Sequence, residues 1–370
     1  MKKSILSLMS LLVLMAFVTS CSSDEPSGES IFVTEEEKNM SEFDKWLYAK
    51  FTVPYNIEFR YRYQDSETDN YYNVVPAEPY KAQALAILVK SLWIDAYETV
   101  FGATFIKQYG PKVYQLLGSP EFDSQQSIVL GYAESGVKIT LFRVNEIDLD
   151  NIYVNLTDAF RDHYALPMDL NFWYFHTMHH EFFHIMTQTR NFPTDFNMIS
   201  AGKYHTSDWI NVKDDEAPME GFVTGYASKE PNEDMAEVFS TYVTSTDVVW
   251  NQILNASRIV TGSTTKLDKD GNPVYKLDAD GNRIIKDYLY DQDGNPVYKL
   301  IDGKLYYAYE YEVETIDTYD DTYYNIILQK LDMVRDYMKD SWGINLDDLR
   351  DEVLRRTEGV YDLDLRTLKY

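Results

Sequence analysis

The sequence predicts an α+β fold that is mainly helical and carries a small mixed sheet. Two long segments, 80–101 and 169–189, have apolar residues at helical spacing. The segment 55–63 instead alternates apolar and polar residues, as a half-buried strand does. A β-hairpin is expected over 127–144, where two short apolar runs flank a turn at 134–136. Together these patterns favour a helical body with one small sheet.

The remaining elements follow from the same kind of pattern. Segment 103–117 is expected to be helical with a break at Gly110-Pro111, because proline lacks the N–H that a helix interior needs. Segment 193–217 has no periodicity and is expected to be a loop. Further helices are predicted over 231–253, 321–340 and 346–356.

The first 20 residues have the composition of a secretory signal peptide. Lys2 and Lys3 precede an apolar run over about residues 5–18, which is too short to span a membrane comfortably. Val-Thr-Ser-Cys at 18–21 resembles a bacterial lipobox, so we expect cleavage before Cys21 and lipidation of its thiol. A plain secretory signal with an incidental cysteine is the alternative.

Composition excludes several classes of function. Cys21 is the only cysteine, so the sequence offers no disulfide, no thiolate zinc ligand and no cysteine-protease nucleophile. The formal net charge of −26 is not interrupted by a basic cluster, which argues against a nucleic-acid partner. Residues 21–40 are polar and acidic and predict a flexible tether. Because acidic residues after a lipobox resemble a surface-export signal, we expect an outer-membrane lipoprotein exposed at the cell surface. The periplasmic face is the alternative.

An internal repeat changes the character of residues 262–312. Asp-x-Asp-Gly-Asn recurs at 268–272, 278–282 and 291–295, and it indicates short strands joined by Asp-Gly turns. A calcium loop is the alternative. An EF-hand, however, needs Asp-x-Asp-x-Asp-Gly and a glutamate at its twelfth position, and the repeats lack that order.

The strongest chemical signal is His-Glu-x-x-His at 180–184. On a helix, His180 and His184 lie on the same face one turn apart, so both imidazoles can reach one zinc ion. Glu181 beside them can accept a proton from water. The helix is apolar on most sides, which predicts that it is buried. Asp169 is a candidate for its N-terminal cap.

A catalytic zinc site takes three protein ligands. The metzincin pattern would place a glycine at 187 and a histidine at 190, and Thr187 and Arg190 exclude it. A glutamate from a downstream helix is the other source, and Glu-x-x-Ala-Glu at 233–237 is the candidate. Glu233 and Glu237 face the same way, one turn apart. Asp234 is the rival third ligand.

At this point the sequence resembles a known branch of zinc peptidases. His-Glu-Phe-Phe-His, then Gly-Phe-Val-Thr-Gly-Tyr-Ala at 221–227, then Asn-Glu-Asp-Met-Ala-Glu-Val-Phe is similar to the lethal-factor and Pro-Pro-endopeptidase branch of the gluzincins. The match covers roughly residues 170–245. The whole chain is similar to the substrate import-associated zinc metallohydrolase lipoproteins, which accompany TonB-dependent import systems.

The resemblance implies a zincin-like fold with the sheet over the motif helix, and a role for each residue. His180, His184 and Glu233 would hold one Zn²⁺, and Glu181 would be the general base. Tyr226, seven residues before Glu233, would donate its hydroxyl to the reacting carbonyl. Glu237 would orient a ligand imidazole. The alternatives are an ordinary aromatic for Tyr226 and a solvated or helix-pairing carboxylate for Glu237.

The other histidines carry weaker expectations. His176 lies one turn before His180 and could touch the site, but a packed or hydrogen-bonded role is favoured. His179 points off that face and receives no role. His163 and His205 lie in loop-like sequence, and we expect neither to act, although His205 could line the cleft.

The predicted organisation is a signal peptide (1–20), a lipidated tether (21–40), a catalytic domain (41–261), a hairpin-repeat insertion (262–312) and C-terminal helices packed on the catalytic domain (313–370). The expected function is a lipid-anchored zinc endopeptidase that acts on a peptide or glycopeptide and is associated with outer-membrane import components. The alternative is a non-catalytic binding or import-accessory lipoprotein with a structural or relict zinc site. In that case His176 would be the candidate to close the fourth position.

Overall fold

The computed structural model describes residues 39–63, 74–122, 128–129, 131–134 and 137–370. The chain divides into two units, Met1–Lys45 and Trp46–Tyr370. In the first unit, the backbone amide and hydroxyl of Ser41 both donate to the Asp44 carboxylate at the start of α3 (Glu42–Leu47). The predicted signal peptide, Cys21 and most of the tether lie outside the described residues, so these expectations stay predictions.

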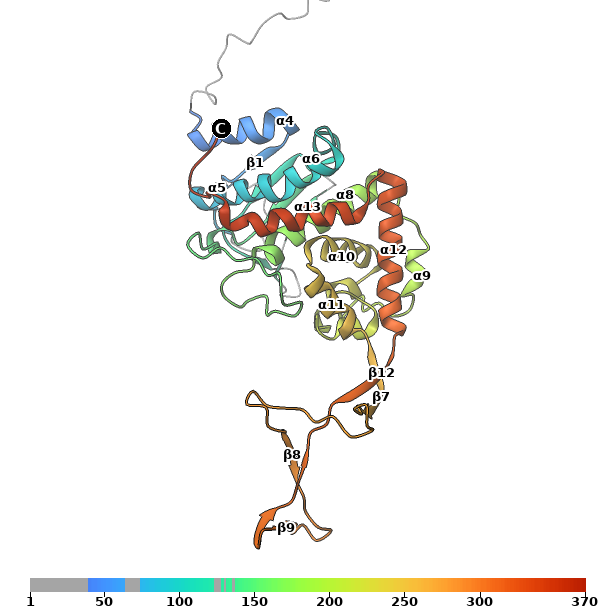
Figure 1. The fold of residues 1–370 in the computed structure, drawn as a ribbon. Coiled ribbons are helices and arrows are strands. Elements are labelled where there is room, and N and C mark those ends of the chain that lie inside the picture. Colours follow the sequence, from blue (N-terminus) through green and yellow to red (C-terminus); the bar gives the residue numbers. More distant parts are fainter. Residues whose placement is uncertain (1–38, 64–73, 123–127, 130, 135–136) are drawn as a thin grey trace, which may run out of the picture. The chain divides into compact units, whose positions relative to one another are not determined.

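The second unit combines helices with a four-stranded sheet, which confirms the mixed helix-and-sheet class (Figure 1). The strand order is β1 (Glu58–Arg60), β2 (Val113–Leu116), β6 (Lys138–Leu141) and β5 (Gly131–Glu134). The first three strands are parallel and β5 runs antiparallel to β6, so the sheet is mixed. The expected hairpin is therefore formed by β5 and β6, and β5 is the edge strand.

The helix expected over 103–117 is only half present. α7 (Phe105–Tyr109) ends at Gly110-Pro111, and the chain then enters β2 instead of resuming a helix. Tyr114 of β2 is fully buried and pairs with Phe59 on one side and Ile139 on the other. These partners are distant in sequence, so local periodicity gave no sign of the strand. The expected strand at 55–63 is likewise shortened to β1.

A long helical segment packs behind the motif helix. It runs through α5 (Pro79–Leu88), a π-helical stretch (Val89–Ile94) and α6 (Asp95–Phe101), close to the predicted 80–101. Two fully buried rings on it, those of Trp93 and Tyr97, each lie 5.0 Å edge-on from the ring of Phe182. These aromatic contacts fix the motif helix against the sheet side of the core.

The motif helix and the helix after it form the centre of the molecule. The first consists of a π-helical start (Asn171–His176) and α8 (Thr177–Thr189), and the second is α10 (Pro231–Thr244). The Asp169 carboxylate accepts the Asn171 amide at 3.0 Å where the first helix begins. The single helix predicted over 231–253 is divided, because the Thr246 hydroxyl caps a new helix, α11 (Asp247–Ala256).

α10 is enclosed on several sides. It packs against α8 and against the two C-terminal helices, α12 (Thr322–Trp342) and α13 (Leu346–Glu358), as Figure 1 shows. Residues 233–244 are all buried. Because so much of α10 is out of water, its polar side chains need partners inside the protein. The predicted helices at 321–340 and 346–356 correspond to α12 and α13.

A buried ion pair joins α12 to α10. The Lys330 ammonium lies 2.7 Å from the Asp234 carboxylate, and both side chains are completely inaccessible to solvent. Lys330 also donates to the Gly221 carbonyl at 2.7 Å and lies over the Phe222 ring, 4.2 Å from its centroid. The Tyr204 hydroxyl donates to the same Asp234 oxygen at 2.9 Å. The C-terminal helices thus hold both α10 and the loop that precedes it.

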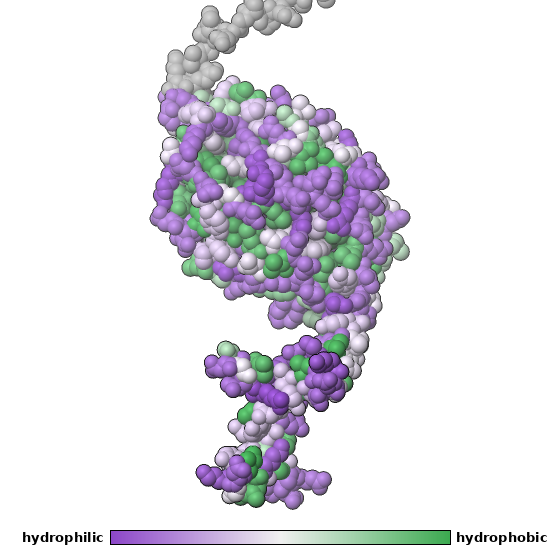
Figure 2. Space-filling view, in the orientation of Figure 1, coloured by the Kyte–Doolittle hydropathy of each residue, from purple (hydrophilic) through white to green (hydrophobic). Residues whose placement is uncertain are grey.

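Between α11 and α12 the chain forms three antiparallel strand pairs. They are β7 (Ile259–Thr265) with β12 (Thr315–Asp320), β8 (Ile285–Tyr288) with β11 (Tyr309–Tyr311), and β9 (Tyr298–Ile301) with β10 (Lys304–Tyr307). The strands begin at 259 and end at 320, so they extend beyond the expected 262–312. Most of their side chains are exposed, and Figure 2 shows polar and apolar side chains intermixed there.

The Asp-x-Asp-Gly-Asn repeats are turns between these strands. In the first, the Asp268 carboxylate accepts the backbone amides of Asp270 and Asn272, both at 2.9 Å, and Gly271 has a positive φ of 83°. The repeats at 278–282 and 291–295 have the same bonds. Aspartate accepts from its own turn and glycine adopts the left-handed conformation, so turn formation alone accounts for the repeat.

The smaller elements are short and connect the larger ones. They are α4 (Val53–Tyr55), β3 (Glu121–Phe122), β4 (Ile128–Val129), α9 (Phe196–Ile199), π-helical Tyr48–Thr52, and 3₁₀ turns at Val144–Glu146, Trp209–Asn211, Ala217–Glu220, Tyr226–Ser228 and Gly359–Asp362. Apart from α9 and the 3₁₀ turn at Trp209–Asn211, segment 193–217 is loop, as expected. Among the described residues, none of the helices combines the length and apolar character that crossing a membrane requires.

The Lys330 ion pair gives a stability prediction. Lys330→Met should lower the free energy of unfolding by about 3–5 kcal/mol, because it leaves the Asp234 carboxylate buried without its countercharge. Urea unfolding followed by circular dichroism measures the change. Lys339→Met, an exposed lysine on the same helix, should change it by less than about 0.5 kcal/mol. Equal effects of the two substitutions would contradict the assigned role of Lys330.

Candidate metal centre

Three side chains from two packed helices converge on one point. His180 and His184 lie one turn apart on α8, and their Nε2 atoms are 3.0 Å apart. Glu233, in the first turn of α10, places its Oε2 atom 3.1 Å from each of these nitrogens. The convergence depends on the packing of α10 against α8, since the two helices are about 50 residues apart in the chain. The structure thus brings together the three residues that the sequence nominates as zinc ligands.

The geometry of this trio fits a zinc ion. Two donors that each lie about 2.0–2.1 Å from zinc at a tetrahedral angle are about 3.3 Å apart. The three separations of 3.0–3.1 Å are close to that value. Two imidazole nitrogens and one carboxylate oxygen are also the donor set of a catalytic zinc site. His180, His184 and Glu233 form one of two His/Glu groups in the described part of the chain that could hold a metal.

The charges of the trio depend on one another. Burial would lower the pKa of His180, but its hydrogen bonds with Glu233 and Glu237 outweigh this effect and raise the pKa to about 10. Burial would raise the pKa of Glu233, but the two histidines outweigh it and hold that pKa well below its usual range. The carboxylate is therefore ionised at neutral pH, and in the metal-free protein His180 is protonated. A bound cation would take the place of that proton.

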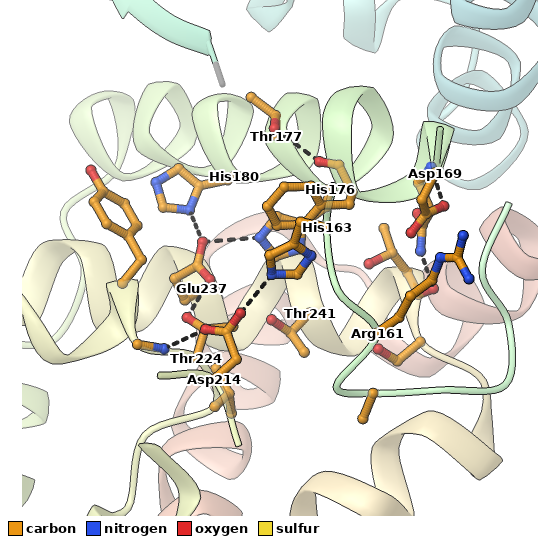
Figure 3. A pocket seen from close by; sticks show the side chains of 18 of the residues that line it. Arg161, His163, Asp169, His176, Thr177, His180, Asp214, Thr224, Glu237 and Thr241 are labelled. Carbon is orange, nitrogen blue, oxygen red and sulfur yellow. Dashed lines mark hydrogen bonds and ion pairs between the residues drawn. The ribbon is translucent and has the colours of Figure 1, made fainter. Parts of the chain in front are cut away.

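Glu237, one turn after Glu233, lies behind the trio. Its Oε1 atom is 2.7 Å from Nδ1 of His180 and 3.0 Å from Nε2 of His176 (Figure 3). Its Oε2 atom accepts the Thr224 hydroxyl at 2.6 Å. A carboxylate at Nδ1 favours the tautomer in which Nε2 is free to bind a metal. His176, His180 and Glu237 form the second of the two groups, and Glu237 is placed to orient the His180 ring.

Tyr226 contacts the oxygen of Glu233 that does not face the two histidines. It begins a 3₁₀ turn, and its hydroxyl donates to Oε1 of Glu233 at 2.9 Å. Burial raises the pKa of this phenol well above its usual range, and the charge of Glu233 adds to the effect. Tyr226 is therefore protonated and can donate a hydrogen bond. Glu181 lines the same cavity as His180 and Tyr226.

The remaining sequence candidates lie elsewhere. Asp234 is turned away from the trio and is bound to Lys330. His179 is buried, and its Nδ1 lies 2.8 Å from the Tyr97 hydroxyl; burial lowers its pKa to about 3. His205 contacts Glu220 at 2.7 Å and does not line the cavity beside the trio.

Two features of the site were missed by sequence reasoning. Lys229 places its ammonium 2.8 Å from Oε1 of Glu233 and 3.1 Å from the Tyr226 hydroxyl. Its position four residues before Glu233 is a helical ion-pair spacing, so the signal was present in the sequence. His163, to which no role was given, lines the cavity with Nε2 held 2.7 Å from the Asp214 carboxylate. His163 and Asp214 lie in separate loops, and no local sequence pattern predicts their contact.

The chain matches a protein-family model described as "putative zinc-binding metallo-peptidase" over residues 36–347. The chain belongs to this family. It is also similar to the crystal structure of a protein described as a putative zinc-binding metallo-peptidase from Bacteroides caccae, with 31% sequence identity and a TM-score of 0.58. The alignment covers 91% of this chain and 99% of the other. No functionally curated protein matches the chain.

Membership of the family supports a zinc metallohydrolase and agrees with the donor set found here. The family was expected from the His-Glu-x-x-His and Glu-x-x-Ala-Glu segments, and this expectation is confirmed. The matched range includes the whole trio as well as Tyr226 and Glu237. The import association and the lethal-factor likeness remain expectations from the sequence.

The position of Glu237 gives a prediction for metal affinity. Glu237→Ala should weaken zinc binding by roughly 10- to 100-fold, because His180 loses the carboxylate that orients it. Competition with a chromogenic chelator measures the dissociation constant. Glu220→Ala removes a carboxylate that contacts His205 instead and should leave the affinity unchanged. Wild-type affinity in the Glu237→Ala protein would show that Glu237 does not support the ligand.

Proposed function

We propose that this protein is a zinc-dependent endopeptidase in which His180, His184 and Glu233 hold the metal. The observation that carries the proposal is the convergence of these three donors within 3.1 Å of one another beside a cavity lined by Glu181 and Tyr226. A three-donor site leaves a position for water, which a hydrolytic zinc centre needs. The zincin-like fold belongs to the same proposal.

Each residue has a role in peptide hydrolysis. Zinc, when bound, would supply a Lewis acid that lowers the pKa of a bound water and polarises the substrate carbonyl. Glu181 accepts a proton from the attacking water and delivers it to the leaving amine. Tyr226 is held protonated by its surroundings, and its hydroxyl donates to the oxyanion as it develops. Lys229 binds the second oxygen of Glu233 and leaves Oε2 for the metal.

The sheet provides a way to hold an extended substrate. β5 is the edge strand, it runs antiparallel to its neighbour, and it contacts α8. A peptide in extended conformation can add to such an edge through main-chain hydrogen bonds. In this proposal the scissile bond then lies over His180 and Glu181.

We place the enzyme on a lipid anchor at Cys21, at the outer membrane and facing the cell surface. The support for this location is the lipobox-like segment at 18–21 and the acidic stretch that follows it. The association with TonB-dependent import rests on the sequence resemblance. The strand pairs between 259 and 320 are the proposed insertion into the catalytic fold, and their many exposed side chains are available to a partner.

A structural zinc site, one form of the non-catalytic alternative, calls for a closed fourth position, and the position of His176 weighs against it. To close the site, His176 would have to supply a fourth ligand to the trio. Its Nε2 atom instead contacts Oε1 of Glu237 at 3.0 Å and lies 3.4 Å from the Ser240 hydroxyl. No observation on the described residues favours a structural site over a catalytic one.

The direct test combines metal content with turnover of a peptide library. The wild-type protein should contain about one equivalent of zinc and cleave peptides. Glu233→Ala should lose most of the zinc, whereas Glu181→Ala should keep it and lose turnover by a factor on the order of 10²–10⁴, because only the general base is removed. A wild-type protein that binds no zinc, or a Glu181→Ala protein with full activity, would contradict the proposal.

Tyr226→Phe separates the roles of base and oxyanion donor. It should keep the zinc and reduce kcat by roughly 10²–10³, the usual loss for one oxyanion donor. Tyr109→Phe, a tyrosine outside the site, serves as the matched control and should retain wild-type kcat. Equal kcat in the two variants would show that the Tyr226 hydroxyl takes no part in the reaction.

A further inference from the structure

A deep cavity opens beside the metal centre. Its volume is about 440 Å³, and it starts at His180, Glu181 and Tyr226. From there it runs along the π-helical start of the motif helix to Thr241 and Thr244 of α10 and Ile253 of α11. The loops that carry His163 and Asp214 line it as well, as Figure 3 shows. Cavities of about 300–1000 Å³ can bury a whole small ligand, so this one can take a large side chain.

Four carboxylates of the lining have protein partners that hold them in place. Asp214 accepts the Gly225 amide at 2.7 Å and contacts His163 at the same distance. Asp169 accepts two backbone amides, and Asp158 accepts one. Glu237 is bound by two histidines and a threonine. A cationic side chain that entered the cavity would compete for these carboxylates with the contacts that they already make.

The two long cationic side chains of the lining, Arg161 and Lys229, have protein partners as well. The Arg161 guanidinium donates to the carbonyls of Ala165 and Pro167, and it lies over the Tyr153 ring at 4.6 Å. Lys229 is paired with Glu233. The Arg161 Nε–H has no hydrogen-bond partner, so it can still donate to an acceptor on a ligand.

Apolar groups, the Arg161 Nε–H and the unpartnered hydroxyl of Thr241 remain for the ligand. The ring of Phe172 stacks on His163 with centroids 3.5 Å apart and forms a flat wall, and Val249 and Ile253 add aliphatic surface. The Thr241 hydroxyl has no hydrogen-bond partner, although the residue is only 6% exposed. A buried hydroxyl without a partner is costly and rare in folded proteins. A ligand atom at this position would satisfy it.

We propose that this cavity is the pocket that receives the substrate residue next to the hydrolysed bond, and that it selects a large side chain with an apolar body and one hydrogen-bonding group, as tyrosine has. The inference rests on the proposed peptidase function and adds the substrate class to it. The apolar body of such a side chain fills the space between Phe172 and Ile253, and its polar group pairs with the Thr241 hydroxyl.

The test uses mass spectrometry of the cleavage products of a peptide library to identify the residues on each side of the cut bonds. Large residues with an apolar body should be enriched on one side of the cut, and glycine and alanine should be depleted there. In purified peptides that differ at this residue alone, tyrosine should exceed alanine in kcat/KM by at least about 100-fold, because alanine leaves the cavity unfilled. The kcat/KM of the tyrosine peptide should exceed that of the phenylalanine peptide by roughly tenfold, which corresponds to the contribution of one hydrogen bond.

Two isosteric variants test the hydroxyl itself. Thr241→Val should reduce the tyrosine-to-phenylalanine ratio to about one. Thr244→Val removes another hydroxyl of the same lining, one that already donates to the Ser240 carbonyl at 2.7 Å, and the ratio should stay at the wild-type value. The affinities of the same peptides for the zinc-loaded Glu181→Ala protein, measured by calorimetry, should follow the same order without turnover.

The outcomes separate the two proposals. A zinc-loaded wild-type protein that cuts no peptide contradicts the peptidase function. Cleavage with equal preference for small and large residues overturns the pocket assignment and leaves the peptidase function standing. A tyrosine-to-phenylalanine ratio that Thr241→Val leaves unchanged shows that the Thr241 hydroxyl does not contact the substrate, and it overturns the assignment of the hydrogen-bonding group.

Discussion

The packing of α8 against α10 is the contact on which the site depends. Each helix alone carries an incomplete set of donors, with two imidazoles on α8 and carboxylates on α10. Their apolar faces meet through rings such as Phe183 and Phe239, which stack with centroids 4.4 Å apart. This contact removes His180, Glu233 and Glu237 from water together. Polar groups buried in this way must satisfy one another or bind a cation, and they are placed to do both.

The first turn of α10 shows how neighbouring acidic residues take separate roles. Glu233 and Asp234 are adjacent, so their side chains point in directions about 100° apart around the helix. One carboxylate faces the histidines, and the other faces Lys330 and is fully buried. The C-terminal helix α12 thereby fixes the rotation of α10 about its axis. The same lysine binds the Gly221 carbonyl, which begins the loop that leads to Tyr226. The helices after 313 thus support the metal centre without contributing a ligand.

What could be predicted from the sequence is what depends on local spacing. The helical position of His180 and His184, the Glu-x-x-Ala-Glu segment and the two C-terminal helices all follow from periodicity. The strand β2 could not be predicted from periodicity, because its pairing with β1 and β6 joins segments that are distant in the chain. Which of Glu233 and Asp234 faces the histidines depends on Lys330, which lies about a hundred residues later in the chain and binds Asp234. The contact of His163 with Asp214 likewise joins two loops that carry no regular pattern.

Anomalous diffraction at the zinc absorption edge, from crystals of the zinc-loaded protein, tests the central claim most directly. The account predicts one zinc peak at about 2.0–2.2 Å from Nε2 of His180, Nε2 of His184 and a carboxylate oxygen of Glu233, with His176 not bound to the metal. A zinc ion bound by His176 or Asp234 in place of one of these three ligands would contradict the account, and so would the absence of a peak at this position.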